Sequence, residues 1–125
     1  VVLPEIISKE PLGPLVRHGD HQWGDVVRWS LNAMIIAEEL GVTSENVDAQ
    51  KSSNVPEVLR LLGVEGSYGE MLELAPDWAY QIIKQIGNYS ESYEANVGPD
   101  TPLEIARGLN ALWTQGGILY APPFR

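Results

Sequence analysis

The sequence contains no cysteine, and its 8 lysine or arginine residues face 17 aspartate or glutamate residues. The lack of cysteine excludes disulfide bonds, thiolate metal sites and cysteine nucleophiles. With a formal net charge of −9, the chain repels phosphate backbones and anionic lipid surfaces. Neither a nucleic acid nor an anionic membrane is therefore an expected partner. No apolar run approaches the roughly 20 residues that a transmembrane helix requires.

What is present is the composition of a folded globular chain. The 125 residues, 44% of them hydrophobic, amount to one domain or a piece of a larger one. The opening residues Val1–Pro4 are apolar and strand-like, without a methionine or a signal peptide. Because an intact polypeptide rarely begins inside an apolar strand, we expect either that an upstream segment has been removed or that the chain is a fragment.

The pattern predicts a mostly α-helical fold with a short N-terminal extended or strand segment. Pro4, Pro11 and Pro14 exclude a helix from residues 1–17 and leave 12–17 as the best strand candidate. Turn residues and apolar periodicity place the other elements. The expected helices span 20–40, 44–50, 55–62 (with Asn54 as N-cap), 76–86, a segment from Asn88 to about Val97, and one or two within 102–113; residues 118–125 are expected to form an extended tail.

The strongest helix signal lies between Asp20, a good N-cap, and Gly41, a good stop. Apolar and small residues recur on one face of it at a period of 3.6. That face comprises Trp23, Val26, Val27, Ser30, Ala33, Met34, Ala37 and Leu40, widened by Trp29 and Ile36. Glu38 and Glu39 occupy the last turn, where the helix dipole disfavours negative charge. We interpret them as solvated carboxylates; a docking face for a basic partner is the alternative.

The densest polar group is His18-Gly19-Asp20-His21. Two imidazoles and a carboxylate could bind zinc, but a structural zinc site needs about four ligands and a catalytic one about three plus water. Asp20 is also needed as a helix cap. A polar turn without a metal is therefore the preferred interpretation, and no metal site or cofactor is predicted.

No set of catalytic residues is found. The glycine-rich stretch 63–69 lacks the start of a dinucleotide loop and the end of a phosphate loop, so a mobile connector is expected. No Gly-x-Ser-x-Gly elbow occurs. Asn88-Tyr89-Ser90 matches a glycosylation triplet, but Asn88 with Glu91 is better interpreted as a capping box. The tryptophans and tyrosines, at helical spacing, are interpreted as core rather than pocket lining. The sequence thus predicts no enzyme activity.

Several segments in order resemble one family. They are Leu3-Pro4-Glu5-Ile6-Ile7-Ser8-Lys9-Glu10-Pro11-Leu12-Gly13-Pro14, Val16-Arg17, Gly19-Asp20, Asp77-Trp78-Ala79-Tyr80, Ile82-Ile83-Lys84, Gly87-Asn88-Tyr89, Tyr93-Glu94, Asn96-Val97-Gly98, Arg107-Gly108-Leu109-Asn110-Ala111-Leu112-Trp113, Gly116-Gly117 and Tyr120-Ala121-Pro122-Pro123. Together they resemble the C-terminal part of periplasmic general L-amino acid-binding proteins of polar amino acid ABC transporters, solute-binding protein family 3.

The resemblance implies a partial lobe of a two-lobed α/β periplasmic binding protein, without enzyme activity. An intact member closes around a free L-amino acid and delivers it to a membrane permease. Residues 1–12 would be the end of the second lobe and the hinge crossing, with Lys9, Glu10, Pro11 and Leu12 as hinge. Residues 13–125 would be the C-terminal part of the first lobe with a helical extension. The family's ligand-contacting residues lie upstream, so none is assigned here and the fragment alone is not expected to bind ligand.

An incomplete lobe exposes strand edges and apolar faces. We therefore expect a homodimer, or a dimer that exchanges its N-terminal segment. Two other functions compete with solute binding. One is a free-standing acidic helical interaction module that uses the Trp29/Ile36 ridge or the tail 120–125. The other is a metal enzyme or hydrolase built on His18, Asp20 and His21.

Overall fold

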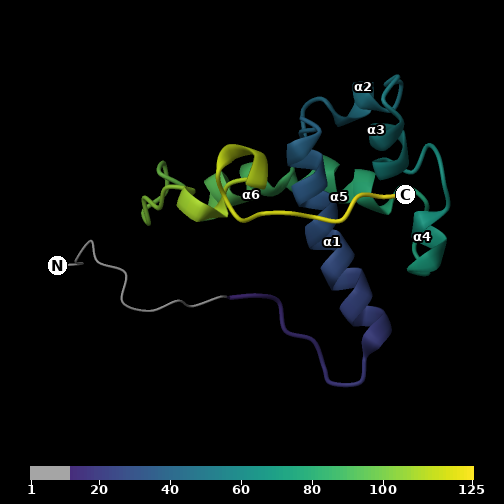
Figure 1. The fold of residues 1–125 in the computed structure, drawn as a ribbon, viewed down its shortest axis with the longest axis horizontal. Coiled ribbons are helices and arrows are strands. Elements are labelled where there is room, and N and C mark those ends of the chain that lie inside the picture. Colours follow the sequence, from purple (N-terminus) through teal and green to yellow (C-terminus); the bar gives the residue numbers. More distant parts are fainter. Residues whose placement is uncertain (1–11) are drawn as a thin grey trace.

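The computed structural model describes residues 12–125. Its longest element is α1, residues His21–Glu39, and the shorter helices gather around one end of it (Figure 1). The other α-helices are α2 (Val47–Gln50), α3 (Pro56–Leu61), α4 (Tyr68–Met71), α5 (Trp78–Ile86) and α6 (Tyr89–Asn96). Two 3-10 turns, η1 (Gly108–Asn110) and η2 (Trp113–Gln115), precede the tail. The predicted mostly helical fold is confirmed.

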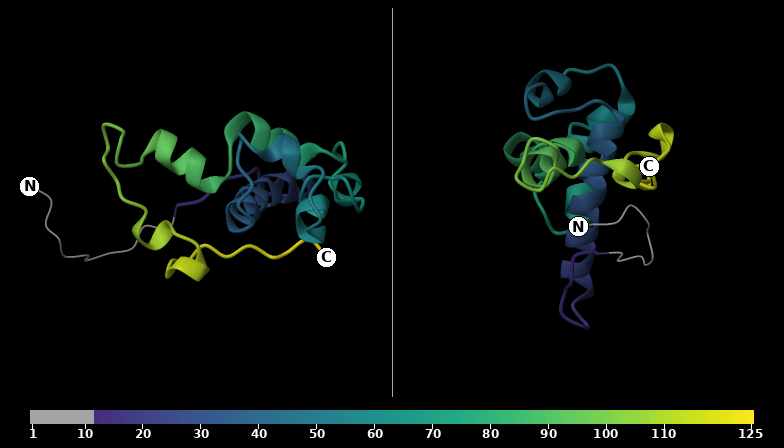
Figure 2. Two further views of the ribbon diagram at one scale, coloured as in Figure 1. Left: turned by 90° about the horizontal axis from the view of Figure 1, so that it is seen from above. Right: turned by 90° about the vertical axis from the view of Figure 1, so that its left-hand side faces the viewer.

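The core forms where the second half of α1 packs against α3, α5 and α6. Ala33 and Ala37 are fully buried there, and α5 contributes Trp78, Ala79 and Ile83. The first half of α1 extends beyond these helices, as the right-hand view shows (Figure 2). The predicted apolar face is therefore buried only in part. Trp23 on that face remains 55% exposed, and the segment that follows α4 borders a hollow beside it without covering it.

The caps of α1 follow the sequence prediction. The Asp20 carboxylate accepts a hydrogen bond from the Trp23 backbone N–H at 3.1 Å, and Gly41, at φ +68, ends the helix. The N-cap of α3 is Val55 rather than the predicted Asn54. The Asn54 side chain makes no capping hydrogen bond, and Pro56 at the first helical position sets the start instead.

Residues 12–17, the predicted strand, have no regular secondary structure. Leu12 and Leu15 are 94% and 97% exposed. A strand needs a neighbour to pair with, and residues 12–125 contain no strand, only an isolated parallel bridge between Leu112 and Leu119. The extended part of the prediction is confirmed; strand pairing is not seen.

One other prediction needs correction. Residues 102–113 form only the short turn η1 and the start of η2, because Glu104 and Gly108 adopt positive φ angles, 50° and 49°, that a right-handed helix cannot contain. The connector predicted in 63–69 is a loop over residues 63–67, of which 64–67 are exposed, and α4 begins at Tyr68. A Cβ on Gly63 would lie 1.9 Å from the Pro76 carbonyl oxygen, so glycine is required by both contact and conformation.

Candidate functional site

The tail of the chain crosses α1 and is anchored by Phe124 (Figure 1). Phe124 is only 8% exposed. Its ring stacks on Trp29 at 5.3 Å between centroids, lies 5.2 Å from Tyr68, and meets Trp78 edge-on at 6.2 Å. Aromatic pairs at these separations are attractive beyond the area they bury. The tail therefore belongs to the core, although the sequence predicts only an extended segment.

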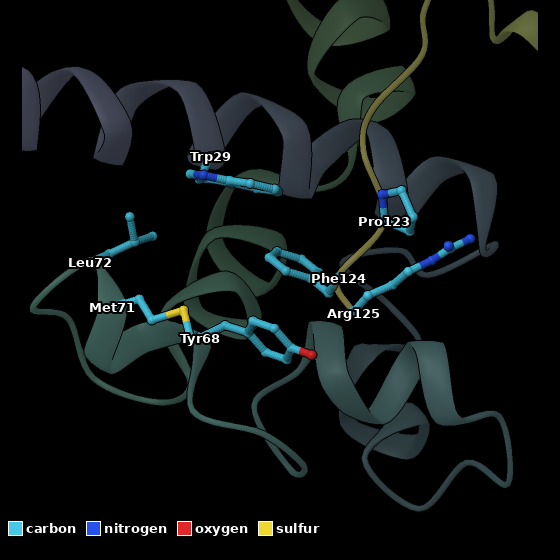
Figure 3. A pocket seen from close by; sticks show the side chains of 7 residues that line it. All are labelled: Trp29, Tyr68, Met71, Leu72, Pro123, Phe124 and Arg125. Carbon is cyan, nitrogen blue, oxygen red and sulfur yellow. The ribbon is translucent and has the colours of Figure 1, made fainter.

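A hollow of about 300 Å³ lies beside Phe124. Figure 3 shows Phe124 between Trp29 and Tyr68, with Met71 and Leu72 on the far side and Arg125 directed away from them. No aspartate or glutamate side chain lines it. A free amino acid needs an acidic partner for its ammonium group and donors for its carboxylate. This hollow is therefore suited to apolar groups rather than to an amino acid.

The tail also covers the ridge on which a free-standing interaction module would depend. Ile36 is 7% exposed, and Trp29 is stacked under Phe124. The two surfaces proposed for that module, the Trp29/Ile36 ridge and the tail, contact each other. The structure therefore does not favour the interaction-module alternative.

Glu38 is not the solvated carboxylate that the sequence suggested, whereas Glu39 is exposed as expected. The Glu38 carboxylate accepts hydrogen bonds from one Arg107 guanidinium nitrogen at 3.0 and 3.1 Å, and both side chains are largely buried. The Glu39 carboxylate accepts a hydrogen bond from the Trp113 indole N–H at 3.2 Å. The last turn of α1 thus binds the 107–113 segment through both carboxylates. These residues are too far apart in the sequence for local patterns to predict the contact.

Arg107 also lies 5.4 Å from the ring centroids of both Tyr89 and Tyr93. Cations are attracted to aromatic faces at this range. Burial raises the pKa of the Tyr89 hydroxyl, so this tyrosine stays neutral. Tyr89 and Tyr93 themselves lie 6.3 Å apart, as their four-residue spacing predicts.

The capping box at Asn88 and Glu91 is confirmed and extends further than predicted. The Asn88 side chain accepts from the Glu91 backbone N–H at 3.0 Å and donates to the buried Val42 carbonyl at 2.9 Å. The Glu91 carboxylate accepts from the Asn88 backbone N–H and from both the backbone N–H and the hydroxyl of Ser44. Asn88 is 4% exposed, so its glycosylation triplet serves as a buried cap.

An exposed polar cluster joins α2 to α5. Asp48 accepts hydrogen bonds from the Lys84 ammonium group at 2.7 Å and from the Tyr80 hydroxyl at 2.8 Å. The hydrogen bond from Lys84, followed by that from Tyr80, lowers the pKa of Asp48. The same contacts raise the pKa of Lys84 and of Tyr80. Lys51 lies 3.4 Å above the Tyr80 ring. The cluster holds two helices together.

The His18–His21 turn is open to solvent. His18, Asp20 and His21 are all exposed, and residues 12–125 contain no group of three or more potential ligands arranged to hold a metal ion. Asp20 is used as the α1 cap. The geometry thus gives no support to a metal enzyme at this turn.

Of the predicted hinge residues, Lys9, Glu10 and Pro11 lie outside the described residues, and Leu12 is exposed without a pairing partner. The ligand-contacting residues, which the resemblance puts upstream, are likewise not represented. No helix among residues 12–125 is long and apolar enough to cross a membrane.

No protein-family model matches the chain, but individual proteins match it over its full length. It is 57% identical to the glutamate/glutamine/aspartate/asparagine-binding protein BztA of Rhodobacter capsulatus and 57% identical to the general L-amino acid-binding periplasmic protein AapJ of Rhizobium johnstonii. Each alignment covers 100% of this chain. The chain is homologous to amino-acid-binding proteins of ABC transporters. The resemblance inferred from the sequence segments is confirmed.

The chain spans 37% of the length of these relatives. A solved structure, an ABC transporter/periplasmic binding protein from Brucella ovis with glutathione bound, matches with a TM-score of 0.95 and 54% identity. That match covers 100% of this chain and 40% of the solved one. The fold of the described residues is therefore part of a periplasmic binding protein fold.

Proposed function

We propose that this chain is part of a periplasmic solute-binding protein that captures L-amino acids and delivers them to the membrane permease of an ABC transporter. The observation that carries the proposal is similarity over the whole chain to amino-acid-binding proteins at 57% identity. Such proteins bind and release their solute unchanged, so the proposed function includes no enzyme activity and no cofactor.

The proposed domain division follows the same reasoning. Residues 1–12 are the end of the second lobe and the hinge crossing, with Lys9–Leu12 as hinge. Residues 13–125 are the C-terminal part of the first lobe with a helical extension. The exposure of Leu12 and Leu15 supports this division, because an apolar segment that belongs inside a sheet has no partner among the described residues.

The ligand class follows from what the relatives are named for. Glutamate, glutamine, aspartate and asparagine share a free α-amino and α-carboxylate group, and so does the γ-glutamyl end of glutathione. We infer that recognition is centred on this head group, with tolerance for the rest of the ligand. The apolar hollow at Phe124 has no acidic side chain to receive the ammonium group, so we do not propose it as the amino-acid site.

Calorimetric titration tests the proposal. Glutamate, glutamine and glutathione are titrated into this chain and into a longer protein that contains it and matches the relatives over their whole length. Binding by the longer protein alone supports the proposal, and N-acetylglutamate, which lacks the free ammonium group, is the control that should not bind. Tight binding of glutamate by the 125-residue chain would show that the ligand site lies within it.

For the isolated chain we propose self-association, as a homodimer or a dimer that exchanges N-terminal segments. Leu15 and Trp23 are exposed apolar side chains on the arm and on the protruding half of α1, and such surface favours association. Light scattering over a range of concentrations should show a dimer that Leu15→Ser and Trp23→Ser weaken. A chain that stays monomeric at high concentration would contradict this.

A further inference from the structure

The extended arm, residues 12–17, lies beside the first half of α1 (Figure 1). The two touch where Val16 packs over Gly24, since a Cβ added to Gly24 would lie 3.6 Å from the Val16 side chain. A hollow of about 260 Å³ separates them elsewhere, and it is lined by Pro14, Val16, Gly24, Val27, Arg28 and Leu31. The arm and the first half of α1 therefore form one open surface, called the arm surface below.

The apolar side chains of the arm surface are covered at one end and uncovered at the other. Val27, Leu31 and Ile35 follow one another at four-residue spacing, so they lie on the same side of α1. Ile35 is 5% exposed, whereas Leu31 is 36% exposed. On the arm, Leu15 is 97% exposed, and successive side chains of an extended segment point to opposite sides. Apolar groups thus wait for a partner on the helix and on the arm.

The backbone of the arm lacks partners as well. Within the part of the chain that the structure describes, residues 12–16 make no backbone–backbone hydrogen bond. An extended segment with free N–H and C=O groups pairs with the open edge of a sheet. A helix that packs against such a strand then covers one face of the sheet. The chemistry of the arm surface therefore fits an apolar β-sheet with an open edge.

We propose that the arm surface is the docking site for the rest of the first lobe, and that this contact holds the two parts together without a peptide bond between them. The inference rests on the proposed function. The chain spans 37% of the length of its relatives, so the greater part of such a protein is available to supply the sheet. A second copy of this chain covers apolar side chains but offers no strand among its described residues. The core at the other half of α1 is formed by residues of this chain, which lets it persist as a separate part.

Cutting a folded protein tests the proposal, because neither part then has to fold alone. A protease recognition sequence is inserted immediately before Val1 in a longer protein that contains this chain and matches the relatives over their whole length. The protein is cut after folding, and gel filtration over a dilution series follows the two parts. They should elute together. Glutamate titration of the longer protein without the insertion tests the proposed function separately, so a failure of capture and a failure of docking give different results.

Three variants locate the contact on the arm surface. Leu15→Asp and Leu31→Asp each place a charge in it and should weaken the association of the cut parts about tenfold or more. Leu15 is almost fully exposed in this chain, so its replacement removes no contact within the chain. Val64→Asp is the control, since Val64 is 50% exposed and does not line the hollow; it should leave the association unchanged. Separation of the cut wild-type parts, or equal association in all three variants, would overturn the proposal.

Discussion

The two halves of α1 have the same helical geometry but very different surroundings. The second half is covered by α3, α5, α6 and the tail, and Ala33, Ile36 and Ala37 there are buried. The first half presents Trp23, 55% exposed, and continues into an arm whose Leu15 is 97% exposed. Apolar periodicity alone does not distinguish the halves. Burial is decided by which other segments are present to cover each face.

Removing the Phe124 ring should cause the largest loss of stability. Phe124→Ala opens a space among Trp29, Tyr68 and Trp78, and we expect the free energy of unfolding to fall by about 3 kcal/mol. Urea denaturation measures it. The matched control on the uncovered half is Trp23→Ala, which should cost less than about 1 kcal/mol. Equal costs for the two variants would contradict the contrast between the halves.

Breaking the ion pair at the end of α1 should rank second. In the wild type Glu38 is 9% and Arg107 16% exposed, so Arg107→Gln leaves a buried carboxylate without its cation. We expect a loss of about 2–3 kcal/mol. The control is Arg28→Gln, whose pair with Asp25 is exposed at 3.6 Å and should contribute no more than about 1 kcal/mol. A double-mutant cycle with Glu38→Gln isolates the pairing energy.

The capping box should come third. Asn88→Ala removes the α6 cap and the buried bond to the Val42 carbonyl, and we expect a loss of about 2 kcal/mol in urea denaturation. Asn54→Ala is the control, because Asn54 precedes α3 without capping it and should change stability by less than about 0.5 kcal/mol. A large loss of stability in Asn54→Ala would instead indicate that Asn54 caps α3, as the sequence predicts.

The smallest effect concerns the exposed cluster on α2 and α5. The hydrogen bond from Lys84 lowers the pKa of the Asp48 carboxyl, so this contact stabilises the fold above the ordinary carboxyl pKa. That contribution is lost as the pH falls through the lowered value. Carbon-13 NMR titration should find the pKa of Asp48 below that of a free aspartate. Lys84→Gln should move it upward, whereas Arg28→Gln, which removes the partner of Asp25, serves as the control that should leave it unchanged.

Local signals in the sequence predict the local elements well. Asp20, Gly41 and the Asn88–Glu91 box mark helix ends because each acts through the backbone within a turn of itself. The family resemblance, which depends on the order of many short segments, is also recovered from the sequence. The absence of an α-helix in 102–113 could not be predicted from the sequence. It depends on the positive φ angle of Glu104, and no local pattern indicates that conformation.

Contacts between residues far apart in the sequence could not be predicted. The partners of Glu38 and Glu39, Arg107 and Trp113, approach α1 only after the chain has turned back across it. Conversely, the predicted hinge at Lys9–Leu12 depends on a neighbouring lobe, and no local physical signal within the described residues tests it.

The position of Phe124 has a consequence for biosynthesis. It is the last buried residue of the chain, and its partners Trp29, Tyr68 and Trp78 all leave the ribosome before it. Until residue 124 has been synthesised, Trp29, Tyr68 and Trp78 lack the ring that packs among them. Completion of this core is thereby tied to the end of synthesis of this segment rather than to the formation of its longest helix.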